Sequence, residues 1–252
     1  MKHVGDCARA RERYFQRATP NLAYVVKHRY AWMNDFIEPG WTGVELGAGS
    51  GLSREIIDKG KLLVTDFAEY DWLDVKNVDA LKTPFEDGAF DFVVESNMIH
   101  HVAHPLAFLE EARRILRPGG RLFIQDVNGS LLMRAVLRLQ RHEGFDYNVD
   151  VFDERVPCND PSDPWSANNA VLDLLFEDRA KFAQKVPYFR IVHESYSEFL
   201  TLLNSGGVIA EAPHVPLPRF LVEAMGKVDR VLTNAFPRLL ALQIQLVLEK
   251  TA

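Results

Sequence analysis

The stretch TGVELGAGSG, residues 42 to 51, places three glycines at every second position, shortly after an acidic residue. Gly47, Gly49 and Gly51 each give up side-chain contacts and increase the entropy lost on folding, so ordinary packing rarely selects them so close together. The residues TGVEL before the glycines predict a short strand, and SREIIDKG after them predicts a helix that ends at Gly60. A strand that runs through a glycine turn into a helix is typical of an α/β fold that binds a ligand at the carboxyl edge of its sheet.

Further apolar strands follow this turn and alternate with helical or loop segments. Residues 61–66, 89–96 and 120–127 are predicted strands, and the helix within residues 104–120 stops at Pro118-Gly119-Gly120. Ahead of the turn, residues 20–38 carry apolar side chains at helical spacing. Because the strands are apolar throughout, we expect an α/β fold with a mostly parallel sheet and helices on both faces.

The strand signal disappears between residues 128 and 187. We expect this block, residues 128–187, to be a helical insert or lid that contributes to the acceptor site, and residues 1–127 and 188–252 to form the core. Beyond the insert, the pattern predicts helices at 195–207 and 219–236, a strand at 208–217 and a closing strand at 239–250.

Composition and charge limit the classes of function that the chain can have. The chain has 252 residues and a net charge of −6, so we expect no nucleic-acid partner. Cys7 and Cys158 lie far apart, which fits a reducing compartment, and no apolar run reaches the roughly 18 residues that a membrane span needs. The charged N-terminus does not resemble a secretory signal, so we expect a cytoplasmic protein. No His/Cys cluster has metal-ligand spacing, so we expect no metal.

The acidic residues around the glycine turn indicate which ligand it binds. Backbone amides at the start of the following helix would face that ligand. Glu45 would repel a pyrophosphate but suits a ligand with a cationic amino-acid end. Asp66, at the end of the next strand, is placed to accept hydrogen bonds from both hydroxyls of a ribose. A structural turn with two solvated carboxylates is the alternative.

Four motifs between residues 40 and 127 occur in the order VELGAGSG, Asp66, VDALKTPFEDGAFDFVVES and EEARRILRPGGRLFIQD. In that order they resemble the class I S-adenosylmethionine-dependent methyltransferases. The resemblance implies a Rossmann-like sheet of seven strands with an antiparallel last strand, a helical insert after the fifth strand, and S-adenosylmethionine as cofactor. It implies a ribose contact at Asp66 and an adenine contact at Asp79 and Ala80. The candidate cofactor-binding residues are Glu45, Gly47, Ala48, Gly49, Gly51, Asp66, Phe67, Asp79, Ala80, Glu95 and Ser96.

One segment departs from the family pattern. Only twelve residues separate Asp66 from Asp79, too few for a full helix and a third strand together. We therefore expect FAEYDWLDVKNV to form a loop or a single turn followed by a short strand.

Two histidines follow the predicted strand at 89–96, where the resemblance places the reacting methyl group. Methyl transfer is an in-line displacement, so the enzyme mainly aligns the two reactants, and a hydroxyl acceptor is helped by a base. His101 is the first candidate for that base and His100 the second; alternatively, one histidine packs in the turn and the other faces solvent. Asp126, at the end of the strand at 120–127, could orient the histidine or accept the proton itself.

Residues that would select the acceptor lie in the N-terminal segment and the insert. Aromatic side chains of the N-terminal segment could cover the adenosyl group or pack in the core: Tyr14, Phe15, Tyr30 and Trp32. Arginines of the insert share one helix face and could bind a phosphate-bearing acceptor or an anionic membrane surface, although a solvated face is the commoner role: Arg134, Arg138 and Arg141. Asn168 and Asn169 could bind sugar hydroxyls or cap the next helix.

The leading hypothesis is therefore a methyltransferase that acts on a small molecule. A looser resemblance to bacterial methyltransferases of polysaccharide and secondary-metabolite assembly suggests O-methylation of a saccharide, nucleotide-sugar, lipid-linked or secondary-metabolite acceptor. One alternative is an NAD-dependent oxidoreductase, which the glycine spacing disfavours, since NAD-binding turns have G-x-G-x-x-G. Another is a catalytically inactive protein that binds S-adenosylmethionine. The sequence leaves the oligomeric state open.

Overall fold

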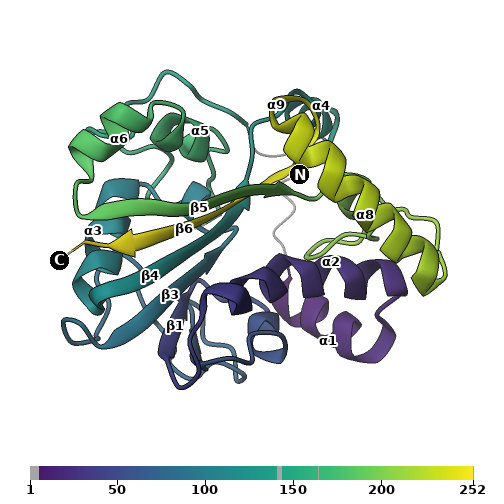
Figure 1. The fold of residues 1–252 in the computed structure, drawn as a ribbon, viewed down its shortest axis with the longest axis horizontal. Coiled ribbons are helices and arrows are strands. Elements are labelled where there is room, and N and C mark those ends of the chain that lie inside the picture. The colour runs from purple at the N-terminus through teal and green to yellow at the C-terminus, as the bar shows by residue number, and fades with distance from the viewer. Residues whose placement is uncertain (1–5, 141–143, 164, 252) are drawn as a thin grey trace.

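The computed structural model describes residues 6–140, 144–163 and 165–251. Within them, six strands form one twisted sheet in the order β2-β1-β3-β4-β6-β5 (Figure 1). The strands are β1 (Thr42–Leu46), β2 (Lys61–Thr65), β3 (Phe90–Ser96), β4 (Leu116–Val127), β5 (Phe189–Ser197) and β6 (Gln243–Lys250).

The sheet is mostly parallel. Strands β1 to β4 run parallel to one another, and β6 lies between β4 and β5 and is antiparallel to both. The prediction that residues 239–250 supply an antiparallel last strand is confirmed by the pairing of Ile124 with Leu246. Because both neighbours of β6 are long strands, its residues Gln243 to Leu248 are buried.

The described residues form six strands rather than the expected seven. The short segment between Asp66 and Asp79 is the reason. It forms turns and reaches the sheet only at an isolated parallel bridge between Thr65 and Val75, beside β2. Twelve residues cannot form both a helix and a paired strand, so the sheet ends at β2 on this side.

Helices cover both faces of the sheet. On one face, α3 (Pro105–Ile115), α5 (Val171–Phe176) and α6 (Arg179–Lys185) pack on inward-facing side chains of the strands in one apolar core. On the other face, α2 (Pro20–Ala31) and the 3-10 helix η1 (Trp32–Phe36) cover a smaller core around Phe92 and Phe123. The α/β class with helices on both faces is therefore confirmed.

Residues 128–187 supply α4 (Leu131–Gln140), α5 and α6. Side chains of α5 and α6, such as Leu175 and Phe182, belong to the same core as the sheet residues Val93 and Ile124. The second half of the segment is thus a layer of the main fold. Arg141 lies outside the described residues.

Three predicted elements are wrong. SREIIDKG forms only the 3-10 helix η2 (Leu52–Glu55) and a turn, because the side chain of Asn34 bonds the backbone of Ile56, Asp58 and Lys59 in place of helical partners. Residues 208–217 form no strand. Their prolines and the side-chain bonds that hold Val215 and Leu217 keep this backbone out of the sheet.

The third error lies in residues 195–207, which the pattern assigned to one helix. Residues up to Ser197 instead belong to strand β5, and the helix that follows is the short α7 (Leu200–Leu203). The chain changes direction at Glu198, which has a positive φ of 58°.

The remaining helices lie beyond the end of the sheet where β3 and β4 finish. They are α1 (Cys7–Arg17), α7, α8 (Arg219–Ala235) and α9 (Pro237–Leu240), and Figure 1 shows α1, α2, α4 and α8 grouped there. A buried ion pair between Arg29 of α2 and Glu198, with an N–O distance of 2.7 Å, ties this group to the end of β5. In the described part of the chain, no helix combines the length and the apolar character needed to cross a membrane.

Candidate active site

The glycine turn lies directly after β1, at the carboxyl ends of the parallel strands. Its three glycines all have positive φ angles, 72° at Gly47, 50° at Gly49 and 62° at Gly51. Side chains disfavour this left-handed region, so glycine is needed here for its backbone conformation alone.

Neighbouring side chains approach the turn closely. A Cβ on Gly47 would come within 2.5 Å of Met98 Cγ, and one on Gly51 within 2.9 Å of Trp72 Cδ1. The Trp72 indole also donates a hydrogen bond of 2.9 Å to the carbonyl of Gly49. The protein's own side chains are therefore one reason that this backbone must stay bare. Trp72 and Met98 were not expected at the turn, because each comes from a loop distant in sequence.

Asp66 lies at the end of β2, half-buried beside the turn. Its Oδ2 accepts a hydrogen bond of 2.7 Å from the amide of Gly49, and its Oδ1 accepts one of 2.8 Å from Ala68. The next residue, Phe67, is 66% exposed. Asp66 thus joins the glycine turn to the second strand, and its carboxylate retains lone pairs for further donors.

Asp79 and Ala80 come from the loop that follows the isolated bridge. The amide of Val78 donates a hydrogen bond of 2.9 Å to the carbonyl of Asp66, which brings this loop to the edge where β2 ends. Asp79 is exposed and accepts a hydrogen bond of 2.8 Å from Leu81, whereas Ala80 packs partly buried against the main core. Asp66 and Asp79 therefore belong to one edge of the sheet.

Glu45 is buried beneath the turn. It accepts a hydrogen bond from the hydroxyl of Ser53 in η2, and Tyr30 lies near it on α2. Burial raises the pKa of Glu45 to about 8 because the charged form loses its hydration. Ala48, also buried, closes the turn by donating a hydrogen bond of 2.9 Å from its amide to the carbonyl of Thr65.

Glu95, His100 and Asp126 form a buried cluster at the ends of β3 and β4, called here the buried acid–histidine cluster. The Nδ1 atom of His100 lies 2.5 Å from Asp126 Oδ1. Glu95 accepts hydrogen bonds of 3.2 Å from the amides of Met98 and Ile99. The two carboxyl groups lie within hydrogen-bonding reach of each other, and burial raises the pKa of Glu95 well above its ordinary value. Glu95 Oε1 and Asp126 Oδ2 have no hydrogen-bond donor among the described residues, and a proton on Glu95 would provide one.

Ser96 and His101 lie at the border of this cluster. Ser96 is half-buried at the end of β3, beside Tyr30 and Asn97. His101, in the 3-10 helix η3 (Ile99–His101), is half-buried, and its Nδ1 lies 3.2 Å from the carbonyl oxygen of Ser166. Its ring centroid is 4.3 Å from that of His100. The structure therefore pairs Asp126 with His100, the second candidate, and places His101 against residues 128–187.

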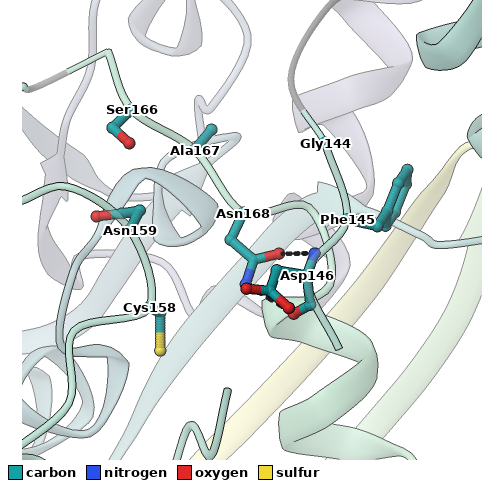
Figure 2. Close-up of a pocket in the computed structure, with 8 residues that line it drawn as sticks. All are labelled: Gly144, Phe145, Asp146, Cys158, Asn159, Ser166, Ala167 and Asn168. Carbon is teal, nitrogen blue, oxygen red and sulfur yellow. Dashed lines mark hydrogen bonds between the residues drawn. The ribbon is translucent and has the colours of Figure 1, made fainter. Parts of the chain in front are cut away.

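A small pocket of about 190 Å³ lies beside residues 99–101, called here the histidine turn. Figure 2 shows the residues that line this pocket. The side-chain amide of Asn159 and the backbone amide of Asn168 both donate hydrogen bonds to the carbonyl of His100, at 3.2 and 2.9 Å. The lining comes from three stretches of the segment 128–187: Gly144, Phe145, Asp146, Cys158, Asn159, Ser166, Ala167 and Asn168. Asn159 was not predicted, because an isolated asparagine in a loop gives no signal of its neighbours.

Asn168 has a structural role. Its side-chain oxygen accepts hydrogen bonds from the amides of Asp146 at 2.9 Å, drawn in Figure 2, and of Ala170 at 3.0 Å. These contacts fix the loop before α5, but no side chain caps the first turn of that helix.

Some of the insert arginines and N-terminal aromatics make contacts within the protein, whereas Arg138 is exposed. Arg134 donates a hydrogen bond of 2.8 Å to the carbonyl of Gly129 and lies over the ring of Tyr147. Tyr30 and Trp32 pack in the smaller core, whereas Phe15 is exposed. Core packing is therefore the role of Tyr30 and Trp32.

Residues 44–124 match the family described as a methyltransferase domain. These residues therefore resemble a methyltransferase domain, and they make up less than half of the chain. A crystal structure of an S-adenosylmethionine-dependent methyltransferase from Archaeoglobus fulgidus has the same fold, with a TM-score of 0.57 and 16% identity over 95% of this chain and 98% of that one. The matched residues begin within β1 and end within β4. They include the glycine turn and both histidines, and Asp126 lies two residues beyond them.

Two curated relatives are methyltransferases by name. The ubiquinone/menaquinone biosynthesis C-methyltransferase UbiE of Roseobacter denitrificans is 38% identical over 73 residues, which is 29% of this chain and 29% of that protein. The 2-phytyl-1,4-beta-naphthoquinone methyltransferase of Arabidopsis thaliana is 27% identical over 162 residues, 50% of this chain and 61% of that protein. The chain thus spans less than two thirds of the length of these relatives.

Proposed function

We propose that this protein transfers a methyl group from S-adenosylmethionine to a small molecule. The observation that carries the proposal is the bare glycine turn at the carboxyl ends of the strands, with Asp66 bonded to it and Asp79 on the same edge. A turn of this kind binds a nucleoside-bearing ligand at the edge of an α/β sheet. The match to a methyltransferase domain identifies that ligand class.

The residues present fit the cofactor. Asp66 has lone pairs for the ribose hydroxyls, and Asp79 offers an acceptor for the adenine amino group beside Ala80 and the exposed ring of Phe67. Glu45 and Glu95 offer carboxyl oxygens near the turn as hydrogen-bond acceptors for the ammonium end, with Gly47 to Gly51 and Ser96 at the borders of the site. When bound, the cofactor supplies an electrophilic methyl group.

His100 is the better supported base in this proposal. Asp126 bonds its Nδ1, which fixes the ring and assigns the basic lone pair to Nε2. A carboxylate in this position also stabilises the imidazolium that forms when the ring accepts a proton. His101 remains the other candidate, since it is less buried and faces the pocket side.

The proposed acceptor is a hydroxylated small molecule that is methylated on oxygen. A saccharide, a nucleotide-sugar, a lipid-linked compound and a secondary metabolite are the candidates, and the names of the curated relatives favour a lipid-linked quinone-type compound among them. That support extends equally to methylation on carbon, because one relative is named a C-methyltransferase. The pocket beside the histidine turn supports an acceptor site that includes residues 144–168 of the helical insert.

Calorimetry of the full chain with S-adenosylhomocysteine and with NAD tests the cofactor. We expect binding of S-adenosylhomocysteine alone, and at least about tenfold weaker binding by Asp66→Ala, a loss of about 1.4 kcal/mol. Binding of NAD without S-adenosylhomocysteine would establish an oxidoreductase instead.

Incubation with donor labelled on its methyl group and a small-molecule extract tests turnover. We expect the label to appear in an extract component. A protein that binds S-adenosylhomocysteine but labels nothing would be an inactive binder.

A further inference from the structure

Helix α8 presents an apolar face to solvent and a smaller, more polar face to the protein. Phe220 and Val231, on the outer face, are 67% and 68% exposed, and Val228 between them is 48% exposed. The buried positions are Val222, Gly226, Asp229 and Thr233. A surface helix ordinarily shows the opposite arrangement, with its apolar stripe toward the core.

Small and polar contacts attach the inner face of α8. A Cβ on Gly226 would overlap the hydroxyl of Tyr24 in α2, so the two helices meet closely at this glycine. Asp229 accepts hydrogen bonds from the amides of Phe199, Leu200 and Thr201, and the Thr233 hydroxyl bonds the carbonyl of Tyr196. Packing therefore buries Val222 and half-buries Met225 and Leu232, but it leaves Phe220, Val228 and Val231 outside.

Helix α9 continues this surface. Phe236 and Leu239 are about half exposed, at 53% and 48%, and α9 contacts both α8 and α4. Figure 1 shows α4, α8 and α9 side by side beyond the end of the sheet where β4 finishes. We call Phe220, Val228, Val231, Phe236 and Leu239 the outer apolar surface.

Cations surround the outer apolar surface although the whole chain is acidic. Between Arg219 and Leu240 the exposed charges are four cations and one carboxylate, whereas the chain carries a net charge of −6. The carboxylate, Glu223, pairs with Arg219 at 2.8 Å in an exposed ion pair that competing anions displace at little cost. The other exposed cations are Lys227, Arg230 and Arg238, and Arg238 forms a second exposed ion pair with Glu177 at 3.6 Å.

We propose that α8 and α9 dock on an anionic membrane surface, with the outer apolar surface in the interface and the cations against lipid phosphates. An apolar face bordered by Lys and Arg is the pattern of helices that lie in the membrane interface. A second copy of the chain fits less well, because a symmetric contact would bring two sets of four cations together. The proposal does not depend on the identity of the methyl acceptor.

Docking through α8 and α9 would place the candidate active site toward the lipid. Helix α4 follows β4 almost directly, so α4, α8 and α9 lie at the end of the sheet that carries Asp126 and the histidine turn. An acceptor carried in the membrane would meet the protein at this end.

Sedimentation of the full chain with vesicles tests the proposal. We expect binding to vesicles of phosphatidylcholine with phosphatidylglycerol and little binding to phosphatidylcholine alone. Lys227→Glu should lower the partition coefficient about tenfold by reversing one charge at the surface. Val231→Ser should lower it about fivefold by removing apolar area from the interface.

Two matched variants serve as controls. Lys59→Glu makes the same charge change in an exposed turn before β2, and Val156→Ser makes the same apolar change in an exposed loop. Both should bind like the native chain, and all four variants should keep its melting temperature, since every altered side chain is exposed. Equal losses in test and control variants would overturn the proposal, as would no binding to anionic vesicles. A native dimer in size-exclusion chromatography that Val231→Ser converts to a monomer would assign the surface to a second copy and overturn it too.

Discussion

At the scale of the residue, Glu45 links protonation to stability. Burial raises its pKa to about 8, whereas an unfolded chain gives about 4.3. Between these values the native state keeps a proton that the unfolded state has lost, so this group stabilises the fold at low pH and the stabilisation disappears as pH rises toward 8. Glu45→Gln removes the titration and preserves the neutral shape. Relative to native, its free energy of unfolding should therefore rise by about 1.4 kcal/mol per pH unit across this window.

Urea denaturation of the ligand-free chains at a series of pH values checks this prediction. Glu86→Gln, an exposed change in a turn, is the control and should follow the native curve. Parallel pH curves for Glu45→Gln and native would show that Glu45 is already ionised in the fold.

A substitution of Asp126 distinguishes which of the two histidines acts as the base. Asp126→Asn keeps the side-chain size but loses the charge that stabilises a protonated His100, so transfer of labelled methyl should slow by about 10–100-fold if His100 is the base. The dissociation constant of S-adenosylhomocysteine should stay within about twofold of native. His101→Ala slowing transfer by at least about tenfold, with an unaffected Asp126→Asn, would assign the role to His101 instead.

A matched control for Asp126→Asn is available at the opposite edge of the sheet. Asp91 bonds the amide of Thr42 at the start of β1 and pairs with Arg117. Asp91→Asn should lower stability without changing the pH dependence of methyl transfer.

At the scale of the element, the glycine turn needs glycine both for its backbone conformation and because neighbouring side chains crowd it. Substitutions at two glycines measure these two effects separately. Gly47 has a φ of 72° and faces Met98, whereas Gly40 has a φ of 89° and open space around it. Gly40→Ala should cost about 1 kcal/mol of unfolding free energy from conformation alone. Gly47→Ala should cost about 1–3 kcal/mol more because its methyl group overlaps Met98.

Urea denaturation measures both glycine variants. Adding Met98→Ala to Gly47→Ala should recover part of the difference, since the cavity left by Met98 accepts the new methyl group. Equal costs for Gly47→Ala and Gly40→Ala would mean that Met98 moves aside freely.

The elements that the sequence predicts are those with a local signal. Strands β1 to β4 and β6 are apolar runs bounded by Gly, Pro or charged residues, so their existence follows from the pattern. Strand β5 escaped prediction because it is an edge strand with polar Arg190, His193 and Glu194, and its apolar residues are only partly covered. The turn after η2 escaped prediction because Asn34, 22 to 24 residues earlier, supplies its hydrogen bonds.

The candidate site shows the same limit. Glu45, Asp66 and the glycines are consecutive or end adjacent strands, so their proximity follows from a parallel sheet. The pairing of His100 rather than His101 with Asp126 depends on the direction of one residue in a 3-10 helix, which no pattern of the sequence encodes.

At the scale of the whole molecule, one core joins the sheet to residues 128–187. Phe176 of α5 is buried in the cluster that contains Leu109 of α3 and Leu246 of β6. A separable insert would instead have a core of its own. Residues 44–124 and α5 are therefore expected to unfold as one cooperative unit.

Phe176→Ala tests this cooperativity. Removing a buried ring from a close-packed core costs about 3–5 kcal/mol. The free energy of unfolding of the whole chain should fall by that amount, and the urea midpoint should move to a lower concentration while the transition stays single. Circular dichroism and tryptophan fluorescence should report the same midpoint, since Trp41 lies by β1 and Trp165 lies within residues 128–187. Leu139→Ala, at a position of α4 that is 86% exposed, is the control and should change stability by less than about 0.5 kcal/mol. Two separate transitions, with only the first moved by Phe176→Ala, would instead show that residues 128–187 unfold as an independent insert.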